Sequence, residues 1–147
     1  MRLDDLEATL ALGARLAALA RPGDVIALSG DLGAGKTSIA RGLLAALGLE
    51  EEAPSPSYAI VQPYAPPEVP FPVLHVDLYR IEHPDEAEEL GLDDARDESL
   101  LIVEWPERLG KGAWRDALWL TLETLPDGAR GLTAKVPPAW EARWPST

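Results

Sequence analysis

Apolar and polar positions follow two different periods along the chain. Short apolar-rich runs occupy residues 25–29, 73–78 and 100–103, and the last of these contains no polar side chain. Runs of this length are typical of strands that are covered on both faces in a parallel sheet. Residues 4–20 and 38–47 instead repeat apolar side chains at intervals of three and four, which is the period of an amphipathic helix. The pattern therefore predicts strands and helices in alternation.

Aspartate, proline and glycine mark the ends of the two predicted helices. Asp4 and Glu7 have the spacing of a capping box, so we expect the first helix to begin at Asp4. Pro22 and Gly23 end this helix, and Gly48 is a suitable C-cap for the second one. We expect the first helix to pack on the sheet.

The second half of the chain predicts shorter elements. An extended segment is expected at residues 58–61 and a short helix at residues 84–90. Residues 118–122 and 132–136 alternate on either side of a Pro-Asp-Gly turn, which predicts an antiparallel hairpin. Five prolines stand within residues 63–72. A flexible linker or a ligand for a proline-binding module would have this composition, but the position between two predicted strands favours a stiff hairpin loop.

A glycine-rich motif, GDLGAGKT at residues 30–37, joins the first predicted strand to the second helix. Its spacing, G-x-x-x-x-G-K-[ST], is that of a phosphate-binding P-loop. Glycines let successive backbone N–H groups point inward, and the N-terminus of the following helix attracts the same anion. In such loops the lysine reaches the β- and γ-phosphates and the threonine hydroxyl binds Mg²⁺. We therefore predict that ATP is bound by Asp31, Leu32, Gly33, Ala34, Gly35, Lys36, Thr37 and Ser38.

The fold class that follows is an α/β sandwich of the P-loop NTPase type. We expect a central, mostly parallel sheet with antiparallel additions and helices on both faces. The 147 residues are expected to form a single domain. The start of the first helix has two interpretations: it packs on the sheet, which we favour, or it lies near the nucleotide base. Residues 137–147 form a tail of uncertain order, in which Trp140 and Trp144 either seal the core edge or form a contact surface.

Two carboxylates are candidates for the metal and the attacking water. Asp77 and Glu104 each follow an apolar strand, so both are expected at the edge of the sheet where ligands bind. Together with Lys36 they form the predicted catalytic set. We expect Thr37 and Glu104 to ligate Mg²⁺, with Asp77 as the second acid of the metal site. Glu104 is the first choice for direct ligation because its strand is expected to be the more fully buried.

Four further side chains near these positions have two interpretations each. Ser57 either senses the γ-phosphate and Mg²⁺ or belongs to a plain proline-serine turn. Trp105 packs either against the nucleotide or in the core. Arg80 either stabilises charge in the transition state or pairs with the acidic residues that follow it. For His75, we favour a hydrogen-bonded structural role over that of a general base.

Composition and charge narrow the class of function. The formal net charge is −12, and acidic residues are dense in 82–98, so independent nucleic-acid binding is not expected. The chain has no cysteine and therefore no disulfide or thiolate metal site. No apolar run approaches the roughly 20 residues of a membrane span, and the N-terminus does not resemble a signal peptide. We expect a cytoplasmic protein with no membrane contact.

Absent motifs narrow the reaction. No Asn-Lys-x-Asp motif is present to read guanine, which favours ATP over GTP. No arginine-rich lid segment of the kind found in small-molecule kinases is present, so water is the expected nucleophile. The rival hypotheses are a P-loop kinase of a small metabolite and a nucleotide-dependent binding module without useful hydrolysis.

Five short motifs occur in an order and spacing that resemble the bacterial TsaE (YjeE) family. They are GDLGAGKT at 30–37, SPSY at 55–58, HVDLYR at 75–80, ELGL at 89–92 and VEWP at 103–106. The likeness runs from about residue 4 to about residue 136. The family usually has threonine where Ser57 stands, so the hydroxyl is kept and the β-branch is lost.

This resemblance implies a function. Proteins of the TsaE type are small ATPases required to form N6-threonylcarbamoyladenosine (t6A) in tRNA, and they act by binding the TsaD–TsaB complex. Carried over to this chain, Lys36 and the loop amides would hold the phosphates, and Thr37 and Glu104 would ligate Mg²⁺. Asp77 would be the second essential acid, and Trp105 would neighbour the nucleotide. The ATPase is expected to be slow alone and to depend on its partner.

Overall fold

The computed structural model describes residues 1–31, 34–50, 61–88, 90–110 and 116–144. The strands are β1 (Arg2–Leu3), β2 (Val25–Gly30), β3 (Val61–Tyr64), β4 (Val73–Asp77), β5 (Leu100–Glu104), β6 (Leu118–Thr124) and β7 (Arg130–Lys135). The α-helices are α1 (Leu6–Leu19), α2 (Lys36–Ala46), α3 (Asp85–Glu88) and α4 (Leu92–Arg96). The described residues also form the 3-10 helices η1 (Pro106–Leu109) and η2 (Pro138–Trp140).

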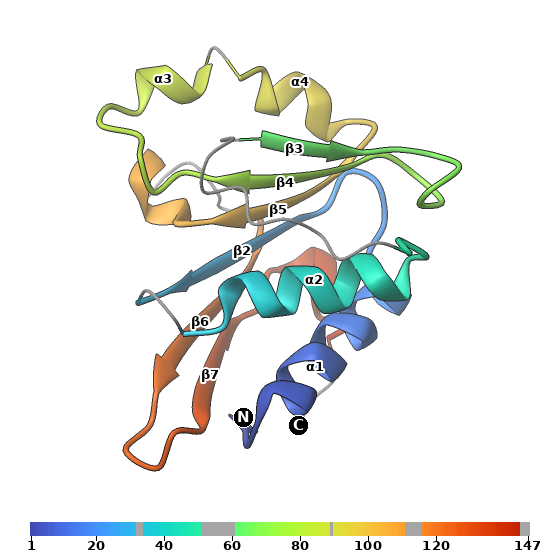
Figure 1. The fold of residues 1–147 in the computed structure, drawn as a ribbon. Helices are drawn as coiled ribbons and strands as arrows, with labels where there is room; N and C mark the ends of the chain where they lie inside the picture. The colour runs from blue at the N-terminus through green and yellow to red at the C-terminus, as the bar shows by residue number, and fades with distance from the viewer. Residues whose placement is uncertain (32–33, 51–60, 89, 111–115, 145–147) are drawn as a thin grey trace.

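The described strands form one seven-stranded mixed sheet with the order β1-β7-β6-β2-β5-β4-β3 (Figure 1). Strands β6, β2, β5 and β4 run parallel to one another, with β2 between β6 and β5. Antiparallel strands extend both edges, β3 beside β4 and β7 and β1 beyond β6. The predicted parallel centre with antiparallel additions is therefore confirmed, as is the hairpin of β6 and β7.

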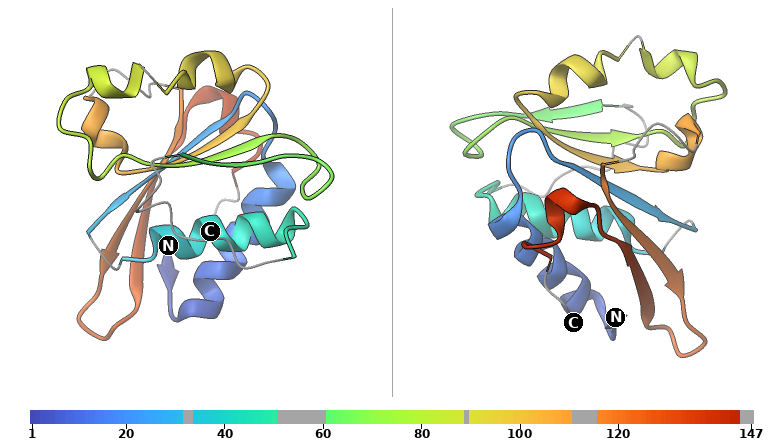
Figure 2. Two further views of the ribbon diagram at one scale, coloured as in Figure 1. Left: turned by 45° about the horizontal axis from the view of Figure 1, so that its top comes forward. Right: turned by 180° about the vertical axis from the view of Figure 1, so that it is seen from behind.

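Alternate side chains of the central strands enter two separate cores. Ile26 and Ile102 belong to the core beneath α1 and α2, whereas Ala27 and Val103 belong to a smaller core on the opposite face. Leu92 of α4 packs into the smaller core. Figure 2 shows α1 and α2 on one side of the sheet and α3 and α4 on the other. Helices thus cover both faces, as the continuous apolar strands require.

Helices α1 and α2 approach each other closely through two glycines. A Cβ atom added to Gly13 would lie 2.3 Å from the Ile39 carbonyl oxygen, and one added to Gly42 would lie 2.3 Å from the Leu10 carbonyl oxygen. Both distances are far below van der Waals contact. The two helices therefore pack backbone against backbone, and this close packing sets the position of α2 beneath the sheet.

The predicted start of α1 is wrong by one residue. Asp5, not Asp4, is the N-cap, and its Oδ1 accepts a hydrogen bond from the Ala8 N–H at 2.8 Å. Asp4 instead accepts a hydrogen bond from Arg2 at 2.6 Å. The chain is extended up to this point because β1 pairs with β7, so the first helical turn begins one residue later.

Helix α2 ends as predicted and begins earlier than predicted. Gly48 has a φ of 116°, and the Leu49 N–H donates to the Leu44 carbonyl at 3.1 Å, which closes the helix with a left-handed C′ residue. Its first helical residue is Lys36, two positions before the predicted start at Ser38. The motif residues Lys36 and Thr37 therefore stand on the first turn of the helix.

The proline-rich segment is a hairpin loop, as predicted, because it joins the antiparallel strands β3 and β4. Pro63 lies on β3, an edge strand, which is where prolines are usually found within sheets. Of the predicted segment 58–61, only its last residue is described, as the start of β3. The expected helix at 84–90 is present as the short α3.

The C-terminal tail contributes to the main core. Trp140 on η2 is fully buried, and Trp144 packs against the same core. Arg143 donates to both Asp24 carboxylate oxygens, at 2.7 and 3.0 Å, and its guanidinium lies 4.0 Å from the Trp140 ring centre. Trp140 therefore seals the edge of the core, which was one of the two interpretations of these tryptophans. Among the described helices, none has the length and hydropathy needed to cross a bilayer.

Candidate functional site

The glycine-rich loop (residues 30–37) runs from the end of β2 into α2. Gly30 and Gly35 have φ values of 139° and 108°, which favour glycine. A Cβ on Gly30 would lie 2.4 Å from the Leu122 carbonyl oxygen, so this position also excludes a side chain for lack of space. Gly35 is the N-cap of α2 and provides no side-chain cap for the first N–H groups of the helix. These donors remain suited to an anion.

Lys36 is buried, and its ammonium group lies against its own loop. Its Nζ donates to the carbonyl oxygens of Gly30 at 2.6 Å and Asp31 at 2.8 Å. The same Nζ lies 4.2 Å from the ring centre of Trp105. Burial lowers the pKa of Lys36, and the nearby carboxylates, Glu104 first among them, oppose this shift. The cation is thus enclosed by carbonyl oxygens, an indole ring and acidic groups.

Glu104 connects the loop to the sheet. The Thr37 hydroxyl lies 2.9 and 3.1 Å from the two Glu104 carboxylate oxygens and donates to this carboxylate. His75 Nε2 lies 2.6 Å from Glu104 Oε2. Residues 75, 77 and 104 stand on the α2 face of the sheet because side chains alternate along each strand. The predicted pair of Thr37 and Glu104 is therefore in direct contact.

Asp77 lies at the same edge, in different surroundings. It pairs with Glu104 in the register of β4 and β5, and its Oδ1 accepts a hydrogen bond from the Tyr79 N–H at 2.9 Å. Burial raises the pKa of Asp77, the Tyr79 N–H opposes that rise, and the Glu104 carboxylate adds to it. The carboxyl ends of two parallel strands thus bring two acids together, as predicted.

The oxygen atoms at this edge fit a magnesium ion. Mg²⁺ prefers hydroxyl and carboxylate oxygens and usually keeps water or phosphate ligands for the remaining positions. Thr37 and Glu104 supply such oxygens, and Asp77 supplies a further carboxylate beside them. In the part of the chain that the structure describes, no group of three or more His, Asp or Glu side chains is arranged to hold a metal by itself. Bound phosphate and water would complete the ligand set.

Trp105 stands beside Lys36 in a backbone conformation that is rare for a bulky residue. Its φ of 60° lies in the left-handed region, which costs of order 1–3 kcal/mol. Its ring packs on Tyr79 with centroids 4.9 Å apart, and the Arg108 guanidinium lies 5.5 Å from the Tyr79 ring centre. Trp105 is half-buried: it packs against the smaller core and also contacts Lys36.

A cavity of about 150 Å³ adjoins the other side of the loop. It is lined by Leu3, Asp5, Leu6, Thr9, Gly35, Ser38, Gly128 and Arg130. Ser38 and Gly35 are predicted site residues, and the start of α1 lines the cavity as one interpretation of the sequence allowed. Gly128, in the predicted turn between β6 and β7, and Arg130, at the start of β7, also line the cavity. Their place beside the glycine-rich loop was not predicted, because it depends on the order of strands in the sheet.

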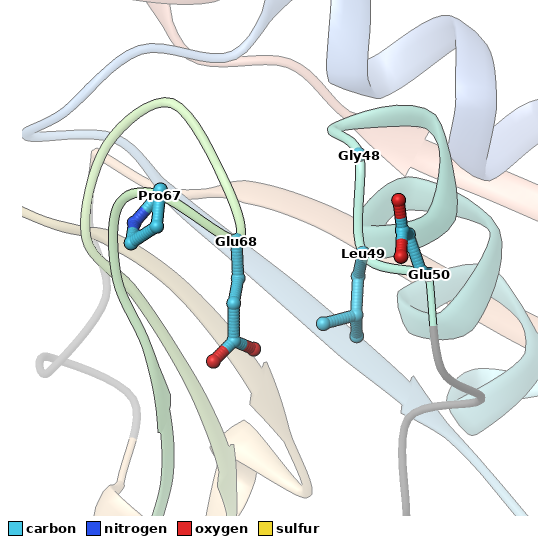
Figure 3. Close-up of a pocket in the computed structure, with 5 residues that line it drawn as sticks. All are labelled: Gly48, Leu49, Glu50, Pro67 and Glu68. Atoms are coloured by element: carbon cyan, nitrogen blue, oxygen red, sulfur yellow. The ribbon is translucent and has the colours of Figure 1, made fainter.

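A second cavity, of about 360 Å³, lies where the end of α2 faces the β3–β4 loop (Figure 3). It is lined by Gly48, Leu49, Glu50, Pro67 and Glu68. None of these residues belongs to the predicted site. Among the described residues, neither the glycine-rich loop nor Asp77 or Glu104 lines this cavity.

Not every predicted residue is described. Leu32, Gly33 and Ser57 lie outside the described residues, so the predictions for them stay predictions. Arg80 is exposed, and Ala34, within the loop, is buried. Arg108, which lies beside Trp105 and Tyr79, was not singled out from the sequence. The available signal was its position three residues after Trp105, at the end of the VEWPER segment.

These observations define a class of protein: an α/β protein with a mixed sheet and a glycine-rich loop between a central strand and a helix. The family model for the threonylcarbamoyl adenosine biosynthesis protein TsaE matches residues 3–131. The chain belongs to the TsaE family.

Relatives and a solved structure agree with this assignment. The tRNA threonylcarbamoyladenosine biosynthesis protein TsaE of Bacillus subtilis is 36% identical over 128 residues, which are 86% of this chain and 78% of the relative. The protein of the same name from Streptomyces coelicolor is 41% identical over 113 residues, 76% of each chain. The crystal structure of Bacillus subtilis YdiB superposes with a TM-score of 0.77 at 29% identity and covers 95% of this chain and 85% of that one.

Proposed function

We propose that this protein is a P-loop ATPase that serves the formation of t6A in tRNA through the TsaD–TsaB complex, in the cytoplasm where tRNA is modified. The observation that carries the ATPase proposal is the contact between Thr37 and Glu104, 2.9 Å long, at the end of the glycine-rich loop. The contact joins the motif's hydroxyl to a strand-end carboxylate, which is the pair of oxygens that a nucleotide-bound Mg²⁺ requires. The TsaE relatives support the tRNA role.

The loop and its surroundings would bind the nucleotide in two parts. The N–H groups of the loop and of the first turn of α2 would hold the phosphates, and Lys36 would leave the Gly30 and Asp31 carbonyls to reach the terminal ones. The cavity of about 150 Å³ beside Ser38 would take the base, with the apolar Leu3 and Leu6 against its faces. The phosphates and the base thus lie on the two sides of Gly35.

The residues at the sheet edge would perform the hydrolysis. When bound, magnesium would neutralise charge on the transferred phosphoryl group, held by Thr37 and Glu104. Asp77 would orient the attacking water and accept its proton, and its raised pKa makes it a better proton acceptor than an exposed aspartate. Lys36 would stabilise the charge that develops on the phosphoryl oxygens.

Turnover by the isolated protein should be slow. Among the described residues, Arg108 is exposed and lies over an aromatic pair, and Arg80 is also exposed, so neither is buried in the site like Lys36. A missing arginine contact typically lowers phosphoryl transfer by 10³–10⁵-fold. The TsaD–TsaB complex would raise the rate, and the net charge of −12 leaves the handling of tRNA to those partners.

Calorimetry with matched lysine variants tests nucleotide binding. We predict that Lys36→Ala abolishes measurable ATP binding in the presence of Mg²⁺, because the loop then lacks the cation that faces the terminal phosphates. Lys135→Ala is the control, since this lysine is exposed on β7 and carries the same charge. Unchanged ATP affinity in Lys36→Ala would contradict the P-loop assignment.

Product analysis separates hydrolysis from the rival functions. Labelled ATP should yield free phosphate, and added TsaD–TsaB should accelerate its release; transfer of label to a small metabolite would support the kinase instead. Glu104→Gln and Asp77→Asn should stop both phosphate release and t6A formation in a reconstituted system. Continued t6A formation with either variant would favour a binding module without useful hydrolysis.

A further inference from the structure

His75 is the one residue of the buried polar cluster that the proposed chemistry leaves without a role. It stands in the middle of β4, its side chain is fully buried, and its Nε2 lies 2.6 Å from Glu104 Oε2. In the register of β4 and β5 its direct neighbour is Ile102, and Glu104 lies diagonally one pleat further on. An apolar side chain would fill this place at no polar cost, so the imidazole calls for a chemical explanation.

The hydrogen-bonding chemistry gives a direction to the contact. A carboxylate only accepts hydrogen bonds, so this contact calls for the His75 tautomer that carries its hydrogen on Nε2. Among the described residues, His75 Nδ1 is buried and has no hydrogen-bond partner. A side chain that leaves one ring nitrogen unpaired in the core costs stability. Within the described part of the chain, its polar contribution is therefore the single bond to Glu104.

That bond completes the restraint of the Glu104 carboxylate. The Thr37 hydroxyl lies within 3.1 Å of both carboxylate oxygens, and His75 holds Oε2 from the side of the sheet. The Thr37 hydroxyl would also serve a metal, whereas the contact of His75 with Oε2 would serve the carboxylate alone. Hydrogen bonds of this kind orient a metal-ligating carboxylate, and their loss typically costs 10–100-fold in metal affinity.

We propose that His75 is a positioning residue that keeps the Glu104 carboxylate in place to ligate magnesium. This inference rests on the proposed function, because it concerns the magnesium ion of the nucleotide complex. His75 touches neither nucleotide nor metal and acts through Glu104. The part of the nucleotide affinity that requires magnesium therefore depends on this buried residue of β4. The binding of phosphate by the loop does not.

The test compares ATP affinity with Mg²⁺ and with EDTA, by calorimetry, in the full chain and two variants. His75→Phe keeps a buried ring and removes the donor, whereas His75→Gln places an amide N–H within reach of Glu104. We expect His75→Phe to lose 10–100-fold of the magnesium enhancement, with affinity in EDTA within about threefold of the wild type. His75→Gln should keep the enhancement within about threefold. Full enhancement in His75→Phe would overturn the role of His75, and so would an equal loss in EDTA.

Two further measurements separate the possible failures. Where His75→Phe does not fold, His75→Asn replaces it, because its shorter amide falls short of Glu104 and the same loss is expected. In the wild-type protein without nucleotide, long-range ¹H–¹⁵N spectra should show His75 protonated on Nε2, and protonation on Nδ1 alone would overturn the proposal. A wild-type protein with no magnesium enhancement at all would overturn the proposed function, whatever the variants do.

Discussion

At the scale of single residues, two acids at one sheet edge differ because their hydrogen-bond partners differ. Glu104 accepts hydrogen bonds from Thr37 and faces His75, whereas Asp77 accepts one backbone N–H, from Tyr79, and burial raises its pKa. The glycine-rich motif identified Lys36 and Thr37 as site residues, because the motif is a pattern of neighbouring residues in the sequence. The contact of His75 with Glu104 was not predictable, since it depends on the register of two strands.

We predict that Asp77→Asn stabilises the protein while it removes the proposed ATPase activity. The pKa of Asp77 is raised in the folded state, so the folded protein binds this proton more readily than the unfolded chain. The free energy of unfolding therefore falls as pH rises from about 4, the unfolded value, through the folded pKa. Asparagine removes this loss and keeps the bond from Tyr79. Urea unfolding at pH 8 should show a gain of about 0.5–2 kcal/mol.

The same measurement at low pH is the control for Asp77→Asn. Below the unfolded pKa of aspartate, both states of the wild-type protein carry the proton, so the variant and the wild type should have similar free energies of unfolding. A variant that is less stable than the wild type at pH 8 would show that the Asp77 charge is favourable in the folded state.

At the scale of elements, the close packing of α1 on α2 positions the glycine-rich loop. Apolar periodicity predicted both helices, because it depends only on residues three and four positions apart in the sequence. It did not predict that Gly13 and Gly42 let their backbones meet, since a glycine inside a helix has no periodic signal. The start of α1 was misplaced for a related reason: the pairing of β1 with β7 keeps the chain extended through Asp4.

We predict that Gly42→Ala destabilises the protein despite the higher helix propensity of alanine. Propensity favours the substitution by about 1 kcal/mol, but the new Cβ would lie 2.3 Å from the Leu10 carbonyl oxygen. Overpacking of this kind typically costs 1–3 kcal/mol, so thermal unfolding should show a lower Tm. Ala45→Gly, at an exposed position of α2, measures the propensity effect alone. A higher Tm for Gly42→Ala would show that the helices separate freely.

At the scale of the whole molecule, the C-terminal tail closes the core that the N-terminal half builds. Trp140 is fully buried beside α1 and α2. Arg143, which follows η2, donates to the Leu19 carbonyl at the end of α1 and to Asp24 in the loop before β2. The family motifs between residues 30 and 106 stand in the sequence itself, and the parallel centre of the sheet could be predicted from the apolar runs. The role of the tail could not, because two tryptophans among prolines have no secondary-structure period.

We predict that Arg143→Ala lowers the free energy of unfolding by about 1.5–3 kcal/mol, because it removes the charged hydrogen bonds of the half-buried Asp24 carboxylate. The side chains of Arg143 and Asp24 are 14% and 13% exposed, so the pair is largely shielded from water. Arg15→Ala, an exposed position on α1, should change stability by no more than about 0.5 kcal/mol. Equal effects of the two substitutions in urea unfolding would contradict a structural role for the tail.

The central claim is that a nucleotide-bound metal sits between the glycine-rich loop and the end of β5. Crystals grown with Mn²⁺ and a non-hydrolysable ATP analogue test it through the anomalous signal of manganese. The account predicts one peak within ligating distance of the Thr37 hydroxyl and the Glu104 carboxylate, with the phosphates along residues 30–37. A peak remote from both side chains, or phosphates bound elsewhere on the protein, would contradict it.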